Sequence, residues 1–160
     1  QRSHDWDVWV AATSQEEENL SGALTSGFAL APDIAVAFDV TFATGPGVPD
    51  HKAFPLGQGI TLGWGPSTHP ALYHAVEEVA HAQDIPLTME PLPMRSGTDA
   101  DMLQIAGRGI PTALFSIPIR YMHTPVEMVE ITDIQAAVAL AQATIESLTQ
   151  GFLDNLSWDE

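Results

Sequence analysis

Short apolar runs of strand length recur along the chain and are separated by segments of a different pattern. They lie at residues 8–13 (VWVAAT), 34–42 (IAVAFDVTF), 59–64 (GITLGW), 87–90 (LTME) and 110–117 (IPTALFSI). A strand that is covered on both faces of a sheet has no polar side, so runs of this kind predict buried strands. We therefore expect these segments to form the central sheet of the protein.

The segments between the runs carry apolar residues at helical spacing. Helices are predicted at residues 20–30, 69–83 and 133–148, with a shorter helix that follows a turn at residues 96–99 and ends near residue 106. One stripe of the segment 69–83 is apolar and consists of Leu72, Ala75, Val76 and Val79. Such a stripe packs against a sheet. Ser21 is available as the N-cap of the first helix, and Thr132 or Asp133 as that of the last.

This alternation of strands and helices predicts the α/β class. The expected architecture is a three-layer α/β/α domain with a mixed, mostly parallel sheet. We expect one domain over residues 1–160, because the sequence contains no internal repeat, low-complexity tract or linker. Residues 44–59 are rich in glycine and proline and predict a long shaped loop, a feature that is often functional in a compact domain.

Composition agrees with a single globular domain. The chain has 160 residues, of which 45% are hydrophobic, and its mean hydropathy is +0.05. No apolar stretch approaches the roughly 20 residues that cross a bilayer, and no signal-peptide pattern is present, so we expect no membrane contact and a cytoplasmic location. The sequence begins with Gln1, shortly before an apolar run, and we interpret it as truncated or processed.

Charge and the absence of cysteine narrow the possible chemistry. Without cysteine there is no disulfide and no thiolate zinc site, so any metal must be held by His, Asp or Glu. Lys and Arg number 5 against 21 Asp and Glu, which gives a formal charge of −16. This charge repels phosphate backbones and argues against nucleic-acid binding. An acidic surface that aids solubility is the simplest explanation of most of these residues.

Some of the acidic residues follow predicted strands. In open α/β sheets the ligand site lies beyond the carboxyl ends of the strands. Glu16 and Glu17 follow the first apolar run, Asp39 lies near the end of the second, and residues 96–99 and 120–123 occupy similar places. These positions are therefore the candidates for a functional site.

Each candidate also has a structural interpretation. A run of glutamates is most often a solvated helix start, where the helix dipole favours negative charge. Asp39 lies within an apolar run, where a carboxylate is costly to bury unless it is paired or metal-bound, but it is also able to brace a neighbouring loop. His123, in a Tyr-Met-His-Thr-Pro turn, is equally consistent with an ordinary surface or core histidine.

Taken together, these residues have the chemistry of a hydrolytic metal site. Glu17, Asp39 and His123 supply the oxygen and nitrogen ligands that suit Zn²⁺, Co²⁺ or Mn²⁺. Glu16 remains as a spare carboxylate that is able to take a proton from a metal-activated water. Two metal ions about 3.5–4 Å apart would orient that water and polarise the scissile carbonyl.

Six ordered segments resemble one family of metallopeptidases. They are residues 15–23 (QEEENLSGA), 38–41 (FDVT), 45–49 (GPGVP), 97–100 (GTDA), 109–112 (GIPT) and 116–127 (SIPIRYMHTPVE). The family includes tetrahedral aminopeptidase, glutamyl aminopeptidase, deblocking aminopeptidase and the enzyme called cellulase M. The resemblance extends from about residue 8 to 150 and makes the chain similar to the C-terminal part of the family's catalytic domain.

The resemblance implies an activity and a role for each candidate. A member of this family hydrolyses the N-terminal peptide bond of peptides with two divalent metal ions, here Zn or Co. Glu16 would be the general base, Glu17 and His123 ligands of one metal, and Asp39 a ligand of the other. Thr98 and Asp99 would lie near the substrate. The family forms homo-oligomers from dimers to dodecamers.

The departures from the family pattern are equally informative. Family members are roughly twice as long, with an N-terminal portion that supplies a His-x-Asp metal ligand, a bridging Asp and a dimerisation domain, and these motifs have no counterpart in this sequence. We therefore expect this chain alone to hold at most one metal ion, weakly, and to be inactive, and its assembly does not follow from the resemblance. Glu18-Asn19 and Ser21 also depart from the usual residues and leave the fine specificity open.

Three other functions compete with this hypothesis. A non-catalytic assembly or binding module that retains the peptidase fold is the alternative from a different class. Metal-dependent acylases and carboxypeptidases are the nearest enzymatic alternatives, because similar ligand sets serve them. A glycosidase is disfavoured, since it needs only paired carboxylates and would leave Asp39 and His123 unexplained.

Overall fold

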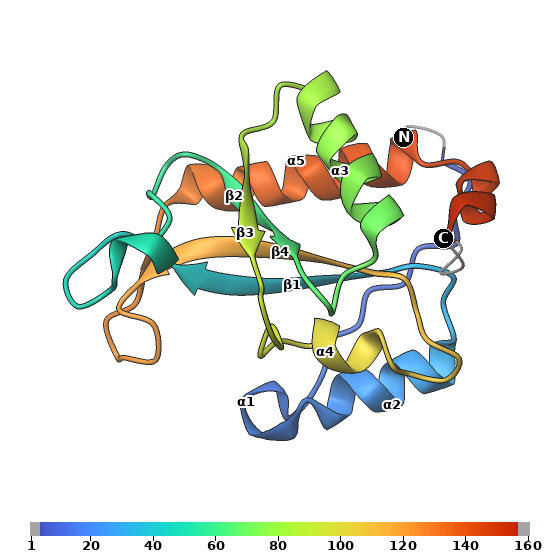
Figure 1. Ribbon diagram of the computed structural model, residues 1–160, viewed down its shortest axis with the longest axis horizontal. Helices are drawn as coiled ribbons and strands as arrows, with labels where there is room; N and C mark the ends of the chain where they lie inside the picture. Colours follow the sequence, from blue (N-terminus) through green and yellow to red (C-terminus); the bar gives the residue numbers. More distant parts are fainter. Residues whose placement is uncertain (1–3, 157–160) are drawn as a thin grey trace.

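A central sheet between two helical layers forms the protein. The computed structural model describes residues 4–156, and within them the strands are β1 (Ala35–Phe42), β2 (Ile60–Trp64), β3 (Leu87–Pro91), β4 (Thr112–Arg120) and β5 (Met128–Val129). The helices are α1 (Glu16–Asn19), α2 (Ser21–Leu30), α3 (Pro70–Ala82), α4 (Ala100–Leu103) and α5 (Ile131–Ser147), with 3₁₀ turns at Asp50–Lys52 and Gln150–Asn155. Figure 1 shows α3 and α5 on one side of the sheet and α1, α2 and α4 on the other. The predicted α/β class is confirmed.

The sheet is mixed, as predicted. Its strand order is β1-β4-β2-β3, and β5 pairs with β4. Among the described strands, β1 runs parallel to β4 and β2 parallel to β3, whereas β2 and β5 are antiparallel to β4. Because β1 and β4 are parallel, their carboxyl ends meet at one edge of the sheet. Asp39 lies in the second half of β1 and His123 follows β4, so both candidates lie toward that edge.

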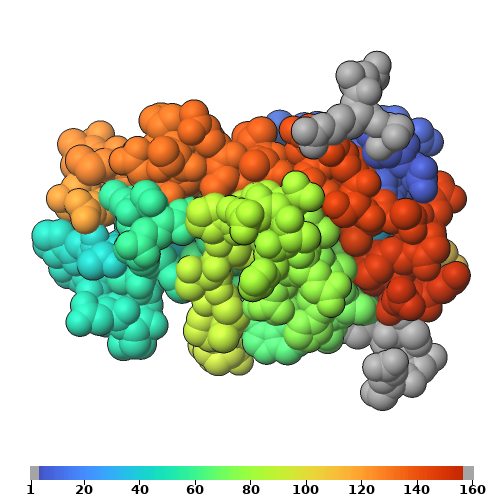
Figure 2. All heavy atoms as spheres, turned by 90° about the horizontal axis from the view of Figure 1, so that it is seen from above, coloured from blue at the N-terminus to red at the C-terminus, as the bar shows by residue number. Residues whose placement is uncertain are grey.

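The larger core lies between the sheet and the layer of α3 and α5. Leu72 and Val76 of α3, Leu140 of α5, and Ile60 and Phe115 of the sheet are all buried there. Figure 2 shows α3 and α5 side by side over this face. The apolar stripe predicted for α3 is therefore the surface that packs on the sheet.

A smaller core lies on the opposite face, where α2 and α4 cover the first half of β1. Ala37, Ala100 and Leu114 are buried in it. Gly27 of α2 allows a close approach, because a Cβ there would lie 2.9 Å from the Cβ of Ala106. The second half of β1 carries Asp39, one of the candidate site residues.

The predicted strand at residues 8–13 is wrong in this structure. The segment has no regular structure and pairs with none of the described strands. Trp9 and Val10 are 73% and 95% exposed. An apolar run supplies side chains that suit a covered strand, but the strand exists only where a neighbour completes its hydrogen bonds.

The predicted helix caps are also wrong. α2 follows Leu20, which has a left-handed backbone with φ of 60°, and the Ser21 hydroxyl donates to Oε1 of Gln15 instead of capping the helix. α5 begins at Ile131, earlier than predicted, so Thr132 and Asp133 lie inside its first turn. α4 ends at Leu103, before the predicted end near residue 106, and the two-residue β5 is too short to give a sequence signal.

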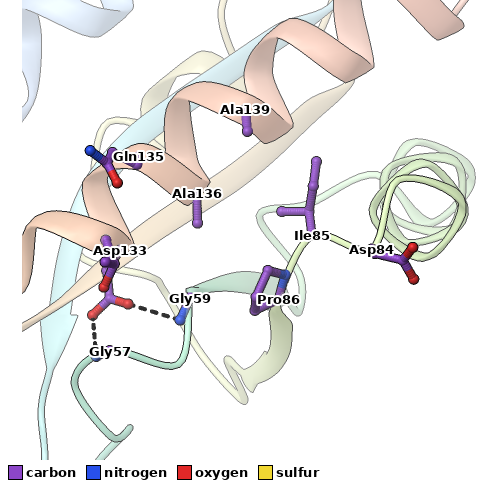
Figure 3. A pocket seen from close by; sticks show the side chains of 10 residues that line it. Gly57, Gly59, Asp84, Ile85, Pro86, Asp133, Gln135, Ala136 and Ala139 are labelled. Carbon is purple, nitrogen blue, oxygen red and sulfur yellow. Dashed lines mark hydrogen bonds between the residues drawn. The ribbon is translucent and has the colours of Figure 1, made fainter.

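Asp133 attaches the long loop at residues 44–59 to α5. Its side chain is fully buried, and the backbone N–H groups of Gly57 and Gly59 donate to its two oxygens at 2.8 Å each (Figure 3). Gly59 has φ of 91°, and a Cβ there would lie 2.1 Å from the Pro86 carbonyl oxygen. The loop therefore reaches β2 through a backbone path that only glycine permits.

Asp101 fixes the turn that carries Thr98 and Asp99. It is 3% exposed, and it accepts hydrogen bonds from the Ser67 hydroxyl, from N–H and Oγ of Ser96 at 2.9 Å each, and from the Gly97 N–H at 2.9 Å. Burial raises the pKa of Asp101, but these hydrogen bonds outweigh it and hold the pKa below its usual value. The turn is therefore held by an ionised carboxylate.

No helix within residues 4–156 has both the length and the apolar content needed to cross a bilayer.

Removal of the Asp133 carboxylate should destabilise the fold. We expect Asp133→Ala to lower the free energy of unfolding by about 3 kcal/mol, because two charge-assisted hydrogen bonds are lost and their donors are left without a partner. Urea unfolding followed by circular dichroism measures this. Asp133→Asn keeps one acceptor oxygen, so its free energy of unfolding should fall by less. Asp154→Ala, on the exposed C-terminal turn, should leave the free energy of unfolding almost unchanged. An equal loss of stability in Asp133→Ala and Asp154→Ala would contradict the conclusion that Asp133 attaches the loop to α5.

Asp101 should make the free energy of unfolding depend on pH. Its pKa is lower in the folded than in the unfolded chain, so its contribution is complete above the unfolded value of about 3.9 and disappears as pH falls through the folded value. Asp101→Asn should therefore cost about 2 kcal/mol near neutral pH and progressively less under acid conditions. Urea midpoints measured from neutral to acid pH test this, with Asp154→Asn as the control. If the loss of stability in Asp101→Asn did not change with pH, ionisation of Asp101 would not contribute to stability.

Candidate active site

Glu16 and Glu17 lie on a one-turn helix that is closed at both ends by left-handed residues. Gln15 has φ of 62° and Leu20 has φ of 60°, and the Gln15 carbonyl accepts from the N–H groups of residues 18, 19 and 20. The turn is held tightly to the preceding segment, since a Cβ on Gly22 would lie 2.2 Å from the Ser14 carbonyl oxygen. This local geometry presents Glu17 to solvent and leaves Glu16 half-buried.

Asp39 and His123 approach the same place from neighbouring strands. Asp39 is half-buried on β1 and accepts a hydrogen bond from the Val40 N–H at 2.7 Å. His123 follows β4 in a turn where it has φ of 62°, and the Glu127 carboxylate accepts from its N–H at 2.6 Å. The turn rotates the imidazole toward α1.

A contact between two candidate ligands joins α1 to the turn after β4. Nε2 of His123 lies 3.4 Å from Oε2 of Glu17, and both side chains are largely exposed. Two ligands that are each about 2.0–2.1 Å from a tetrahedral zinc ion lie about 3.4 Å from each other. The two donors therefore fit a shared divalent ion, with imidazole nitrogen and carboxylate oxygen as the ligand types such ions prefer.

The carboxylates of the site repel one another. Burial raises the pKa of Glu16, and the negative charges of Asp39, Glu17 and Asp99 raise it further, while His123 lowers it. Burial also raises the pKa of Asp39, against the opposing effect of the Val40 N–H, and nearby carboxylates add to the rise. The structure thus brings the predicted Glu16, Glu17, Asp39, Asp99 and His123 into one electrostatic neighbourhood.

Thr98 and Asp99 have different surroundings. The Thr98 hydroxyl is buried and is used within its own turn, 2.9 Å from Oγ of Ser96 and 3.2 Å from the Ala100 N–H. Asp99 accepts from the Thr13 hydroxyl at 2.5 Å through Oδ2. Its Oδ1 atom is buried and has no hydrogen-bond partner among the described residues. Asp99 therefore has a free acceptor at the site, whereas Thr98 is a structural part of the turn.

The candidate ligands do not form a complete metal centre within the part of the chain that the structure describes. Residues 4–156 contain no group of three or more His, Asp and Glu side chains placed to hold one ion. The described residues offer the Glu17–His123 pair for one ion and Asp39 beside it. The group lies on an open surface, and the cavity of about 300 Å³ beside Asp133 and Ala136 lies elsewhere, against α5 (Figure 3).

Sequence reasoning missed one acidic residue near the site. Glu90 on β3 accepts from the hydroxyls of Thr41 and Thr61 at 2.6 Å each, and its charge contributes to the raised pKa of Asp39. The residue ends the apolar run at 87–90, so its place near a strand end was the available signal. Only the strand order shows that it reaches toward β1.

Comparison with known proteins supports the fold described above. "Lysyl aminopeptidase" of Pyrococcus furiosus is 41% identical over 145 residues, which are 91% of this chain and 42% of that protein. The solved aminopeptidase APDkam598 of Desulfurococcus kamchatkensis superposes with a TM-score of 0.89 at 34% identity, over 96% of this chain and 45% of that one. The TET1 peptidase of Pyrococcus horikoshii gives a TM-score of 0.69 at 27% identity, over 85% of this chain and 40% of that one.

The chain therefore spans less than half the length of the relatives it matches. Residues 1–140 match the family model described as M42 glutamyl aminopeptidase, a range that includes every candidate residue named above. The ordered segments and the α/β fold agree with that match. This chain belongs to the M42 glutamyl aminopeptidase family.

Proposed function

We propose that this chain is the part of a metal-dependent aminopeptidase that carries the general base and ligands for both metal ions. The observation that carries the proposal is the 3.4 Å approach of Glu17 Oε2 to His123 Nε2, with Glu16 and Asp39 in the same electrostatic neighbourhood. The substrate class is peptides with a free N-terminus. Because the chain spans 42% of its lysyl aminopeptidase relative, we propose the activity for the parent protein and expect this chain alone to be inactive.

The ligands divide between two ions. Glu17 and His123 would hold one divalent ion, Zn or Co, and Asp39 would contribute to the second. Such ions would supply Lewis-acid chemistry, lowering the pKa of a water and polarising the scissile carbonyl. With one imidazole and one carboxylate for the first ion, this chain would hold it weakly, and we expect at most one bound ion.

Glu16 is suited to move the proton. Its carboxylate is beside the ligand Glu17 but is not itself needed as a ligand, and burial together with its acidic neighbours raises its pKa. A carboxylate of raised pKa is a stronger base, so Glu16 would accept a proton from the attacking water and return it to the leaving amine.

Asp99 and Thr98 would act on the substrate side. The free Oδ1 of Asp99 is an acceptor for the α-ammonium of the peptide N-terminus, while Oδ2 is held by Thr13. Thr98 would act as a positioning residue, because its hydroxyl accepts the Ala100 N–H and so orders the start of α4 next to Asp99.

The assembly of the parent protein and a second candidate function are also proposals. The TET1 peptidase of Pyrococcus horikoshii is described as assembling into a tetrahedron or a large octahedral shell, and we propose a homo-oligomer for the parent of this chain. A non-catalytic module that retains the fold is the second candidate, favoured by the lack of a three-ligand group within the described residues.

Metal content should follow the proposed ligands. After dialysis against Zn²⁺ or Co²⁺, we expect at most one ion per chain, and Glu17→Ala or His123→Ala should remove it because each leaves a single donor. Plasma emission spectroscopy measures the content. Glu18→Ala, which removes an exposed neighbour on α1, is the matched control and should retain the ion. Two tightly held ions, or equal loss in Glu18→Ala, would contradict the ligand assignment.

Removal of the Glu16 carboxylate should lower turnover and leave metal binding unchanged. In the parent protein, we expect Glu16→Gln to lower kcat for release of an N-terminal residue by about 10²–10⁴-fold with unchanged metal content, because proton transfer is lost while the ligands remain. Amino-acid release from a short peptide provides the assay. A parent protein without this activity would favour the non-catalytic module, and turnover by this chain alone would show that its site is complete.

A further inference from the structure

His123 lies in the loop of a β-hairpin. The strands β4 and β5 pair antiparallel, with Ile119 opposite Val129 and Arg120 opposite Met128. Residues 121–127 connect the two strands and form the loop. The sheet therefore fixes both ends of the loop, whereas the position of the His123 imidazole depends on contacts within the loop.

Two residues of the loop have a backbone conformation that side chains disfavour. Tyr121 and His123 have φ of 59° and 62°, in the left-handed region that residues other than glycine rarely adopt. Such residues persist where the surrounding contacts hold them. Tyr121 has contacts of this kind, because its carbonyl accepts from the Thr124 N–H at 3.1 Å and from the Thr124 hydroxyl at 2.6 Å. His123 needs a contact of its own.

Glu127 provides that contact. Its Oε1 atom accepts from the His123 N–H at 2.6 Å, a charge-assisted hydrogen bond. Glu127 immediately precedes β5, whose pairing with β4 anchors its backbone. The bond is made to the backbone of His123, so the imidazole remains directed to the site, with Nε2 3.4 Å from Oε2 of Glu17. Glu127 thus links the position of a candidate ligand to the end of the sheet.

Two simpler roles for Glu127 fit the structure less well. As a third metal ligand it would have to form a group with Glu17 and His123 around one ion, and residues 4–156 contain no group of three such side chains. As a brace of the hairpin it would duplicate the strand pairs that already join β4 to β5. A carboxylate that holds the left-handed backbone of a candidate ligand points instead to a role in positioning that ligand.

We propose that Glu127 is a positioning residue that holds His123 in the conformation in which its imidazole meets Glu17, an inference that rests on the proposed metal-dependent function. A change of φ at His123 to the ordinary negative range would redirect the Cα–Cβ bond and carry the imidazole away from Glu17. Without the hydrogen bond, part of the population adopts that range. The apparent metal affinity falls with the fraction of chains that keep the competent conformation.

The Zn²⁺ affinity of this chain measures the positioning. Zn²⁺ is titrated while the His123 imidazole resonances, assigned by comparison with His123→Ala, are followed by NMR. We expect Glu127→Ala to weaken binding by about tenfold, as when groups that orient metal ligands are removed. Glu127→Gln should bind within about threefold of the unaltered chain, because its amide oxygen accepts the same hydrogen bond and only an exposed charge is lost.

Amide exchange tests the hydrogen bond without metal. In the metal-free chain, hydrogen exchange at the His123 N–H should be about tenfold faster in Glu127→Ala, the effect of one hydrogen bond, and nearly unchanged in Glu127→Gln. Unchanged chemical shifts at Ile119 and Val129 would show that the hairpin is intact.

A control separates this hydrogen bond from general charge. Glu130→Ala removes an exposed carboxylate three residues farther along the chain and should leave both measurements unchanged. Equal losses of Zn²⁺ affinity in Glu127→Gln and Glu127→Ala would show that the charge of Glu127, and not its hydrogen bond, matters. An equal loss in Glu130→Ala would show that the effect is not specific to Glu127. Either result would overturn the proposal.

The two levels of the proposal fail separately. Glu127-dependent Zn²⁺ binding, together with no peptide hydrolysis by the parent protein, would support Glu127 as a positioning residue and reject the aminopeptidase function. Zn²⁺ binding at His123 with equal affinity in Glu127→Ala would retain the metal site and reject the role of Glu127. No Zn²⁺-induced change at the His123 imidazole of the unaltered chain would reject the ligand assignment and the positioning role with it.

Discussion

The pairing of β4 with its neighbours is the interaction on which the rest of the structure depends. β4 lies inside the sheet between β1 and β2, and β5 joins its end. Its parallel register with β1 places Asp39 opposite Ser116, and its antiparallel register with β2 places Ser116 opposite Thr61. A shift of one residue would turn all these side chains to the other face. The site therefore exists because one buried strand fixes the alignment of its neighbours.

Repulsion between like charges destabilises this arrangement. Several carboxylates meet on one face with a single imidazole, and burial and mutual repulsion raise the pKa of both Glu16 and Asp39. Cations relieve such repulsion, whether they are metal ions between ligands or the ammonium groups of a substrate. The proposed metal ions would relieve this repulsion. An acidic surface made only for solubility would spread its charges instead.

Most of the fold was predictable because its strands are short apolar runs with clear ends. β1, β2, β3 and β4 lie within a few residues of the predicted ranges, and α3 buries the predicted stripe. The failures have a common cause. The segment 8–13 has the side chains of a covered strand but no ladder partner in the described structure, and Asp133 has the side chain of a helix cap but bonds to Gly57 and Gly59. Both outcomes depend on distant segments.

The sequence by itself determined the family resemblance and the residue types that are available for a metal site. Without cysteine, only His, Asp and Glu remain as metal ligands, and the ordered segments around Glu16, Glu17, Asp39 and His123 carry the family resemblance. Only the tertiary structure decided that Glu17 meets His123 and that Glu90 reaches Thr41. Local patterns record burial and turn preference, whereas these contacts arise from strand order and register, which depend on pairing between segments far apart in the chain.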